Sequence, residues 1–124
     1  MENINELTYM ILGCAYKVHS VLGPGLLEST YEHCLAQEFL MKGLTFERQL
    51  GIPVIYNNSK LEAGYRIDLL IEDRIILELK SVDQLAPIHK AQLLTYMKLS
   101  GKKIGYLINF NVVSLKDGII RMVL

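Results

Sequence analysis

Apolar residues recur at steps of three and four along the first part of the chain, which is the spacing of amphipathic helices. In residues 5–23 the apolar stripe comprises Leu7, Met10, Ile11, Cys14, Val18 and Val21. In residues 26–43 it comprises Leu27, Tyr31, Cys34 and Leu35. Asn5 is a candidate N-cap for the first helix, and Gly43 is placed to end the second.

From residue 45 the apolar period changes to two, which is typical of β-strands. Residues 45–49 and 52–58 predict a strand pair or one bent strand. Gly51 and Pro53 favour a place at a sheet edge or at a bulge, because glycine weakens a strand and proline cannot donate to its ladder.

A turn at residues 57–60 leads into a predicted hairpin at 66–80, and a third helix begins at Pro87 and ends before Gly101. The remaining predicted strands are residues 102–110 and 118–124. The resulting order, ααβββαββ, predicts an α/β fold (α+β) with a mixed sheet and helices packed on it. The chain shows no linker or repeat, so we expect a single domain, 1–124.

Composition narrows the classes of function. Thirteen basic side chains balance thirteen acidic ones, so the chain lacks the basic excess of proteins that bind nucleic acid through charge alone. We expect a cytoplasmic protein with no membrane partner, because the longest apolar run is too short to span a bilayer and no signal sequence opens the chain. Cys14 and Cys34 lack CxxC spacing and are predicted to be reduced core residues.

The hairpin at 66–80 places charged residues on one strand face. A three-residue loop at 72–74 is the connection that keeps all six alternating aliphatic residues on the opposite face: Ile67, Leu69, Ile71, Ile75, Leu77 and Leu79. That register sets Asp68 opposite Glu78, with Lys80 on the same face. Opposed side chains have Cβ atoms roughly 5 Å apart, so the two carboxylates share a proton, pair with Lys80 or Arg66, or bind a cation.

Oxygen ligands of this kind suit Mg²⁺ or Mn²⁺, which take one or two carboxylates and keep several waters. The main-chain carbonyl of Leu79 could add a ligand, and Lys80 would reach a metal-bound water or a phosphate oxygen. A solvated salt bridge between Lys80 and the two acids is the alternative that these residues leave open.

An acid followed by nine residues and then E-L-K resembles the core of the PD-(D/E)xK nuclease superfamily, with Ile67 in the place of the motif's proline. Gln92 and Tyr96 match the Q-x-x-x-Y element of the helix that follows, and residues 25–31 read G-x-x-E-x-x-Y. Five segments in order, over roughly the full length, resemble the GxxExxY family within this superfamily.

The resemblance implies a restriction-endonuclease-like core. It implies Asp68 and Glu78 as metal ligands, with Glu28, a candidate third ligand, and His19 near the site. It assigns Lys80 as the catalytic lysine, with Gln92 and Tyr96 in support. His19, Tyr31 and His89 are candidates for hydrogen bonds around the site, although a lone histidine is more often structural.

Other roles remain open for three of these residues. Glu28 is also placed to meet the free N–H groups and the dipole of its helix. Tyr31 is equally a core residue by position, and the helix face that carries His89 is by itself more typical of a solvent-facing surface.

The expected function is a Mg²⁺- or Mn²⁺-dependent nuclease that hydrolyses phosphodiesters of DNA or RNA. A homodimer would give nucleic acid a two-fold pair of sites. The alternative is a catalytically silent nuclease fold that serves as an interaction or regulatory module. Hydrolysis of a different phosphoester is a third possibility.

Overall fold

The computed structural model describes residues 3–124, apart from the side chain of Ala63. The helices are α1 (Ile4–Leu22), α2 (Glu28–Met41) and α3 (Pro87–Ser100), and a 3₁₀ turn forms η1 (Leu115–Gly118). The strands are β1 (Phe46–Tyr56), β2 (Ser59–Ile71), β3 (Ile75–Lys80), β4 (Ile104–Asn109) and β5 (Ile119–Val123). None of the described helices is long and apolar enough to cross a membrane.

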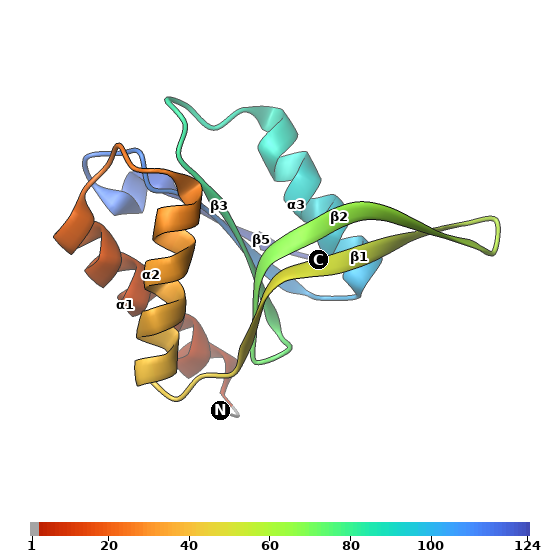
Figure 1. Cartoon of the computed structure of the whole chain (residues 1–124), viewed down its shortest axis with the longest axis horizontal. Helices are drawn as coiled ribbons and strands as arrows, with labels where there is room; N and C mark the ends of the chain where they lie inside the picture. The colour runs from red at the N-terminus through yellow and green to blue at the C-terminus, as the bar shows by residue number, and fades with distance from the viewer. Residues whose placement is uncertain (1–2) are drawn as a thin grey trace.

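The five strands form one sheet in chain order, which confirms the predicted order of elements and the mixed sheet. β3 and β4 are parallel and are joined through α3, whereas the other neighbouring pairs are antiparallel. Helices α1 and α2 cover one face of the sheet and α3 covers the other (Figure 1). Both faces are therefore buried in the middle of the sheet.

The ends of the first two helices differ from the prediction. Asn3, not Asn5, caps α1, and its side chain accepts hydrogen bonds from the N–H groups of Asn5 and Glu6 at 2.8 and 3.4 Å. Val21 and Leu27 are exposed rather than part of the buried stripe, because each lies beside the loop between the two helices.

The segments expected as a strand pair or one bent strand form the single strand β1, and its register against β2 shifts between Ile52 and Val54, around Pro53. β1 is an edge strand, as the proline predicted. Asn57 and Asn58 both have positive φ and close a two-residue turn. The β1–β2 hairpin is longer than expected and extends well past β3 as an arm (Figure 1).

Two apolar cores lie on the two faces of the sheet. The first joins α1 and α2 to the sheet; Cys14 is buried in it and Cys34 packs against it, so both cysteines belong to the core as predicted. The second lies under α3.

The prediction that all six hairpin aliphatics share one face was wrong for Ile67, which packs in the second core together with Leu70 and Ile76. Ile67 and Leu70 are three residues apart, so the alternation of β2 breaks between them. This break coincides with the point where β2 leaves β3.

Candidate functional site

The candidate site lies where β2 and β3 part. The two strands pair from Ile71 with Ile75 to Leu69 with Leu77, which confirms the three-residue loop and the predicted register. Toward the N-terminal end of β2, beyond Leu69, β2 continues alongside β1 only. We call the point where β2 and β3 separate the fork, and Asp68 of β2 and Glu78 of β3 lie there.

Two reciprocal hydrogen bonds close the fork. The backbone N–H of Asp68 donates to Oε2 of Glu78 at 2.8 Å, and the N–H of Leu79 donates to Oδ2 of Asp68 at 2.8 Å. Main-chain groups that the ladder leaves unpaired must find other partners when they are removed from water. Here the carboxylates supply them, so both acids are held in fixed positions by the main chain.

Burial makes this pair costly to ionise. Glu78 is only 5% exposed, and burial followed by the nearby charge of Asp68 raises its pKa to about 8. Burial also raises the pKa of Asp68, against the opposing effect of the Leu79 N–H. The charge of Lys80 lowers the pKa of both acids without restoring either to its ordinary value. The site therefore favours an additional positive charge.

A cleft of about 590 Å³ opens beside Asp68, between the N-terminus of α2 and the fork. Glu28 and Glu32, one turn apart on α2, both line it. Gln49 of β1 donates from its side chain to Glu32 and, at 3.3 Å, to Asp68. Arg48 forms an ion pair with Glu32 at 3.0 Å. A chain of polar contacts thus links α2 to the first acid of the fork.

Sequence reasoning did not identify Glu32, Gln49 or Arg48. The signal for Glu32 was present, because it lies at i+4 from Glu28 and so shares its helix face. Gln49 gave no signal: it lies opposite Asp68 with a positive φ of 51°, which few non-glycine residues adopt.

The residues of the G-x-x-E-x-x-Y segment together form the turn that positions Glu28 at the start of α2. Gly25 has φ of 97°, which an L side chain rarely adopts, and this allows the tight turn before α2. The hydroxyl of Tyr31 donates to the carbonyl of Gly23 at 2.6 Å and accepts the N–H of Leu26 at 3.2 Å. Glu28 is thereby presented at the start of α2, where Oε2 accepts the N–H of Ser81 at 3.3 Å.

The segment that leaves β3 is held from several directions. The N–H of Phe110 donates to the carbonyl of Lys80 at 2.9 Å. The side chain of buried Asn109 bonds both the N–H and the carbonyl of Val82, at 3.0 and 2.9 Å. The hydroxyl of Ser81 donates to the carbonyl of Leu26 at 2.6 Å. The main chain that carries Lys80 is therefore fixed to both the α2 turn and β4.

Gln92 and Tyr96 lie on the other side of the sheet, along α3. The side-chain amide of Gln92 donates to the Tyr96 hydroxyl at 3.0 Å. Tyr96 is buried in the second core, and burial, followed by the charge of Glu78, raises the pKa of its hydroxyl. Both residues line a second cleft, of about 580 Å³, between α3 and the hairpin arm.

The three residues expected around the site have structural contacts. His89 lines the second cleft, and its Nδ1 accepts the N–H of Ala86 at the start of α3. His19 donates from Nε2 to the carbonyl of Val112 at 2.8 Å. Tyr31 stacks on Phe110 with ring centroids 4.3 Å apart.

The oxygen ligands at the fork suit a hard divalent cation that keeps several waters better than a metal held entirely by protein side chains. Within residues 3–124, no three His, Cys, Asp or Glu side chains converge into a complete set of ligands. The carboxylates of Asp68 and Glu78 meet at the fork, Leu79 lines the cleft beside them, and its carbonyl is a further candidate oxygen donor. Mg²⁺ and similar ions are bound in this way, with waters and substrate phosphate completing the coordination.

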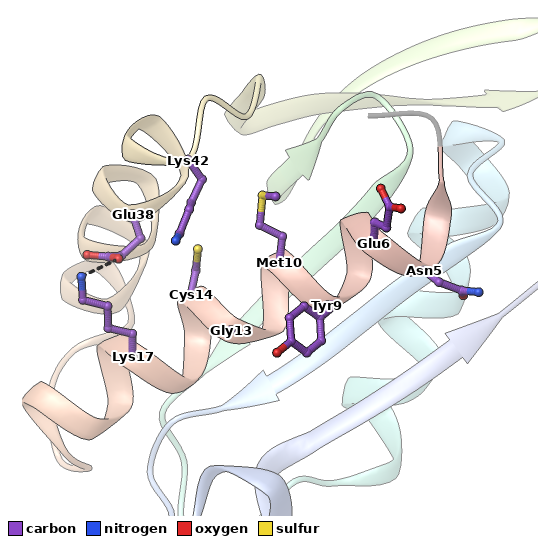
Figure 2. Close-up of a pocket in the computed structure, with 9 residues that line it drawn as sticks. All are labelled: Asn5, Glu6, Tyr9, Met10, Gly13, Cys14, Lys17, Glu38 and Lys42. Carbon is purple, nitrogen blue, oxygen red and sulfur yellow. Dashed lines mark ion pairs between the residues drawn. The ribbon is translucent and has the colours of Figure 1, made fainter.

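A third cleft lies elsewhere, along the outer side of α1 and α2 (Figure 2). It measures about 670 Å³ and has exposed Tyr9 on its wall. Lys17 and Glu38 form an ion pair across it at 3.1 Å, and Lys42 lies nearby (Figure 2). Glu38 in this cleft is therefore paired with a lysine at hydrogen-bond distance.

Comparison with known families assigns the chain to a superfamily. The family model described as the PD-(D/E)XK nuclease superfamily matches residues 5–122, which is nearly the whole chain. No curated protein and no solved structure matches the chain. By its fold and by this match, the chain belongs to the PD-(D/E)XK nuclease superfamily.

Proposed function

We propose that the protein is a Mg²⁺- or Mn²⁺-dependent nuclease of the GxxExxY type, with its active site at the fork between β2 and β3. The observation that carries the proposal is the acid pair of buried Glu78 and half-buried Asp68, held by reciprocal main-chain hydrogen bonds beside Lys80. An acid pair with raised pKa values is costly to ionise unless a cation joins it. Membership of the superfamily makes a nuclease the class of enzyme to test first.

Nucleases of this superfamily generally use divalent metal ions. In this chain Asp68, Glu78 and the carbonyl of Leu79 would hold the ion, and Glu28 would act from the other wall of the cleft. When bound, such an ion polarises a phosphodiester and lowers the pKa of a coordinated water.

The remaining residues would act on the substrate and on one another. Lys80 would stabilise the negative charge that develops on the phosphate, because its ammonium already acts on both acids. Gln92 would orient the Tyr96 hydroxyl, to which it donates. Gln49 would fix the position of the Asp68 carboxylate relative to α2, because its side-chain amide donates to both Asp68 and Glu32. His19 and His89 would fix the surrounding main chain.

The experiment that tests the proposal combines metal binding with cleavage. Mn²⁺ is titrated by calorimetry into the wild type and into Asp68→Asn, which keeps an acceptor for the Leu79 N–H. Cleavage of single-stranded and duplex DNA and RNA is then measured with Mg²⁺ and Mn²⁺. We expect binding and cleavage in the wild type and a loss of cleavage of at least about 100-fold in Asp68→Asn.

A matched control is Glu62→Gln, which removes an exposed acid of the hairpin arm that pairs with Lys60. It should bind metal and cleave as the wild type does. The alternative of a catalytically silent interaction module would be supported by a folded wild type that cleaves none of the four substrates with either metal.

Two further expectations stay predictions. A homodimer would use an outer strand, since β1 and β5 each leave one edge of the sheet unpaired. Light scattering of the purified protein measures this, and a monomer mass at every concentration would exclude it. The cytoplasmic location would be checked by fractionating cells that express a tagged copy.

A further inference from the structure

The second cleft has a different chemistry from the fork. Among the described residues that line it there is no Asp, Glu, Lys or Arg. Two tyrosines, Tyr65 from the arm and Tyr96 from α3, face one another across it, and Gln92 and Thr95 add polar groups. A cleft lined by these groups and by His89, with no carboxylate, lysine or arginine in the described part of its lining, suits a flat, neutral group with hydrogen-bonding edges better than it suits a phosphate.

The two rings meet at an angle, and one of them stays accessible. Their centroids are 6.4 Å apart and their planes are inclined at 52°, so they are not stacked on one another. Tyr96 is 7% exposed and forms a fixed wall, whereas Tyr65 is 48% exposed. Tyr65 therefore keeps an accessible ring on a strand that holds its position.

The cleft lies close to the fork. Tyr65 is on β2, and only Arg66 and Ile67 separate it from Asp68. Ile67 packs with Tyr96 in the second core. A polymer whose phosphate lay at the fork could thus place an adjoining unit in the second cleft.

We propose that this cleft binds an unpaired nucleobase next to the phosphate that is cut, with Tyr65 as its stacking platform. The inference rests on the proposed nuclease function and specifies its substrate as single-stranded nucleic acid, including flaps. Bases of a duplex are stacked on their neighbours and are not free to enter such a cleft. Proteins that bind single strands combine positive charge with stacking on aromatic rings, and in this chain, which has no net charge, stacking would supply the larger share.

The absence of tryptophan from the sequence allows a direct test. Tyr65→Trp introduces the only indole of the protein into the cleft and keeps an aromatic platform. The variant is titrated in EDTA, so that cleavage cannot occur, with a single-stranded oligothymidylate and with a DNA hairpin duplex. We expect the single strand to quench the indole fluorescence and the duplex to leave it unchanged.

The matched control is Tyr9→Trp, which places the indole at an 82% exposed position on α1, on the other side of the sheet. No quenching of Tyr65→Trp by the single strand, or equal quenching of both variants, would overturn the inference.

A second variant, Tyr65→Leu, removes the ring and keeps an apolar side chain. Circular dichroism verifies its fold. We expect its affinity for the single strand, measured by fluorescence anisotropy with a labelled oligonucleotide, to fall about 10- to 100-fold. Unchanged affinity would contradict the inference, as would a dimer of the wild type that Tyr65→Leu converts to a monomer, because the ring would then belong to a protein interface.

Failure of this inference can be told apart from failure of the proposed function. A wild type that cuts duplex and single strand equally well, with no effect of Tyr65→Leu, would remain a nuclease and would lose the base-binding cleft. Specific quenching of Tyr65→Trp with no cleavage under any condition would keep the cleft and remove the nuclease.

Discussion

The backbone N–H of Asp68 donates to the carboxylate of Glu78 at 2.8 Å, so one acid of the site holds the main chain of the other. Removal of the Glu78 carboxylate would therefore take an acceptor from a buried amide as well as a ligand from a cation. Glutamine at this position keeps an acceptor oxygen, whereas alanine does not. Amide variants are accordingly the ones that separate chemistry from folding.

The acid pair should make the metal-free protein less stable as the pH rises. The pKa of Glu78 is about 8 in the folded chain against an ordinary value of 4.5, so the folded state binds the extra proton. This contribution to the free energy of unfolding is fully present below pH 4.5 and is lost as the pH passes through about 8. In EDTA we expect the Tm to fall between pH 6 and pH 9. Scanning fluorimetry at steps of about one pH unit measures this fall.

Glu78→Gln should have a smaller fall in Tm over that range, because its side chain does not titrate. Glu62→Gln, at an exposed position of the arm, should keep the wild-type slope. Equal slopes in wild type and Glu78→Gln would show that Glu78 has no raised pKa.

Lys80→Met should reduce cleavage far more than metal binding. The change removes the ammonium and keeps the length of the side chain, so the loss of stabilised charge in the transition state should cost at least about 100-fold in kcat. Calorimetry at pH 8.5 should find Mn²⁺ affinity within about tenfold of wild type, since the oxygen ligands remain. Lys116→Met, at an exposed lysine of η1, is the control. Full activity of Lys80→Met would remove the lysine from the mechanism.

Tyr31→Phe should destabilise the protein through the loop before α2. The substitution removes the hydroxyl that bonds Gly23 and Leu26 and keeps the ring on Phe110. We expect a loss of about 1–3 kcal/mol in urea unfolding, because a carbonyl and an N–H lose their partner. Tyr9→Phe, which is exposed, should unfold like the wild type. A stability for Tyr31→Phe that matches this control would mean that water replaces the hydroxyl.

Two glycine-to-alanine changes should act in opposite directions. A Cβ on Gly118 would collide with the carbonyl oxygen of Asn109, a main-chain atom that cannot move aside. We expect a loss of about 2 kcal/mol or more. Gly13, inside α1, has open space around its Cβ position, so Gly13→Ala should stabilise by about 0.5–1 kcal/mol. Urea unfolding measures both, and a Gly118→Ala protein of wild-type stability would contradict the packing at η1.

The central part of the fold was readable from the sequence because its signals are local. The alternation of Leu69 and Ile71 with Ile75 and Leu77 determines the loop length of the hairpin, and the loop length brings Asp68 to Glu78. Pro87 and Gly101 mark the ends of α3 for equally local reasons, a fixed φ at its start and a left-handed residue at its end.

What could not be read depends on contacts between distant segments. The alternation of β2 fails at Ile67 because the strand leaves β3 there and enters the core under α3. Gln49 joins the site only because β1 bends opposite Asp68, and a glutamine in a strand gives no sign of positive φ. The buried role of Leu70 and Ile76 likewise depends on α3, which follows both residues in the chain.

Asn109 shows how far the determinants of the site extend along the chain. Its side chain accepts a hydrogen bond from the N–H of Val82 and donates one to the carbonyl of Val82. The N–H of its neighbour Phe110 donates to the carbonyl of Lys80. An inherited change at Asn109 would thus misplace the lysine without touching metal, substrate or either acid. In a survey of variants it would resemble an active-site mutation, although its cause would be the loss of hydrogen bonds between the end of β4 and the segment after β3.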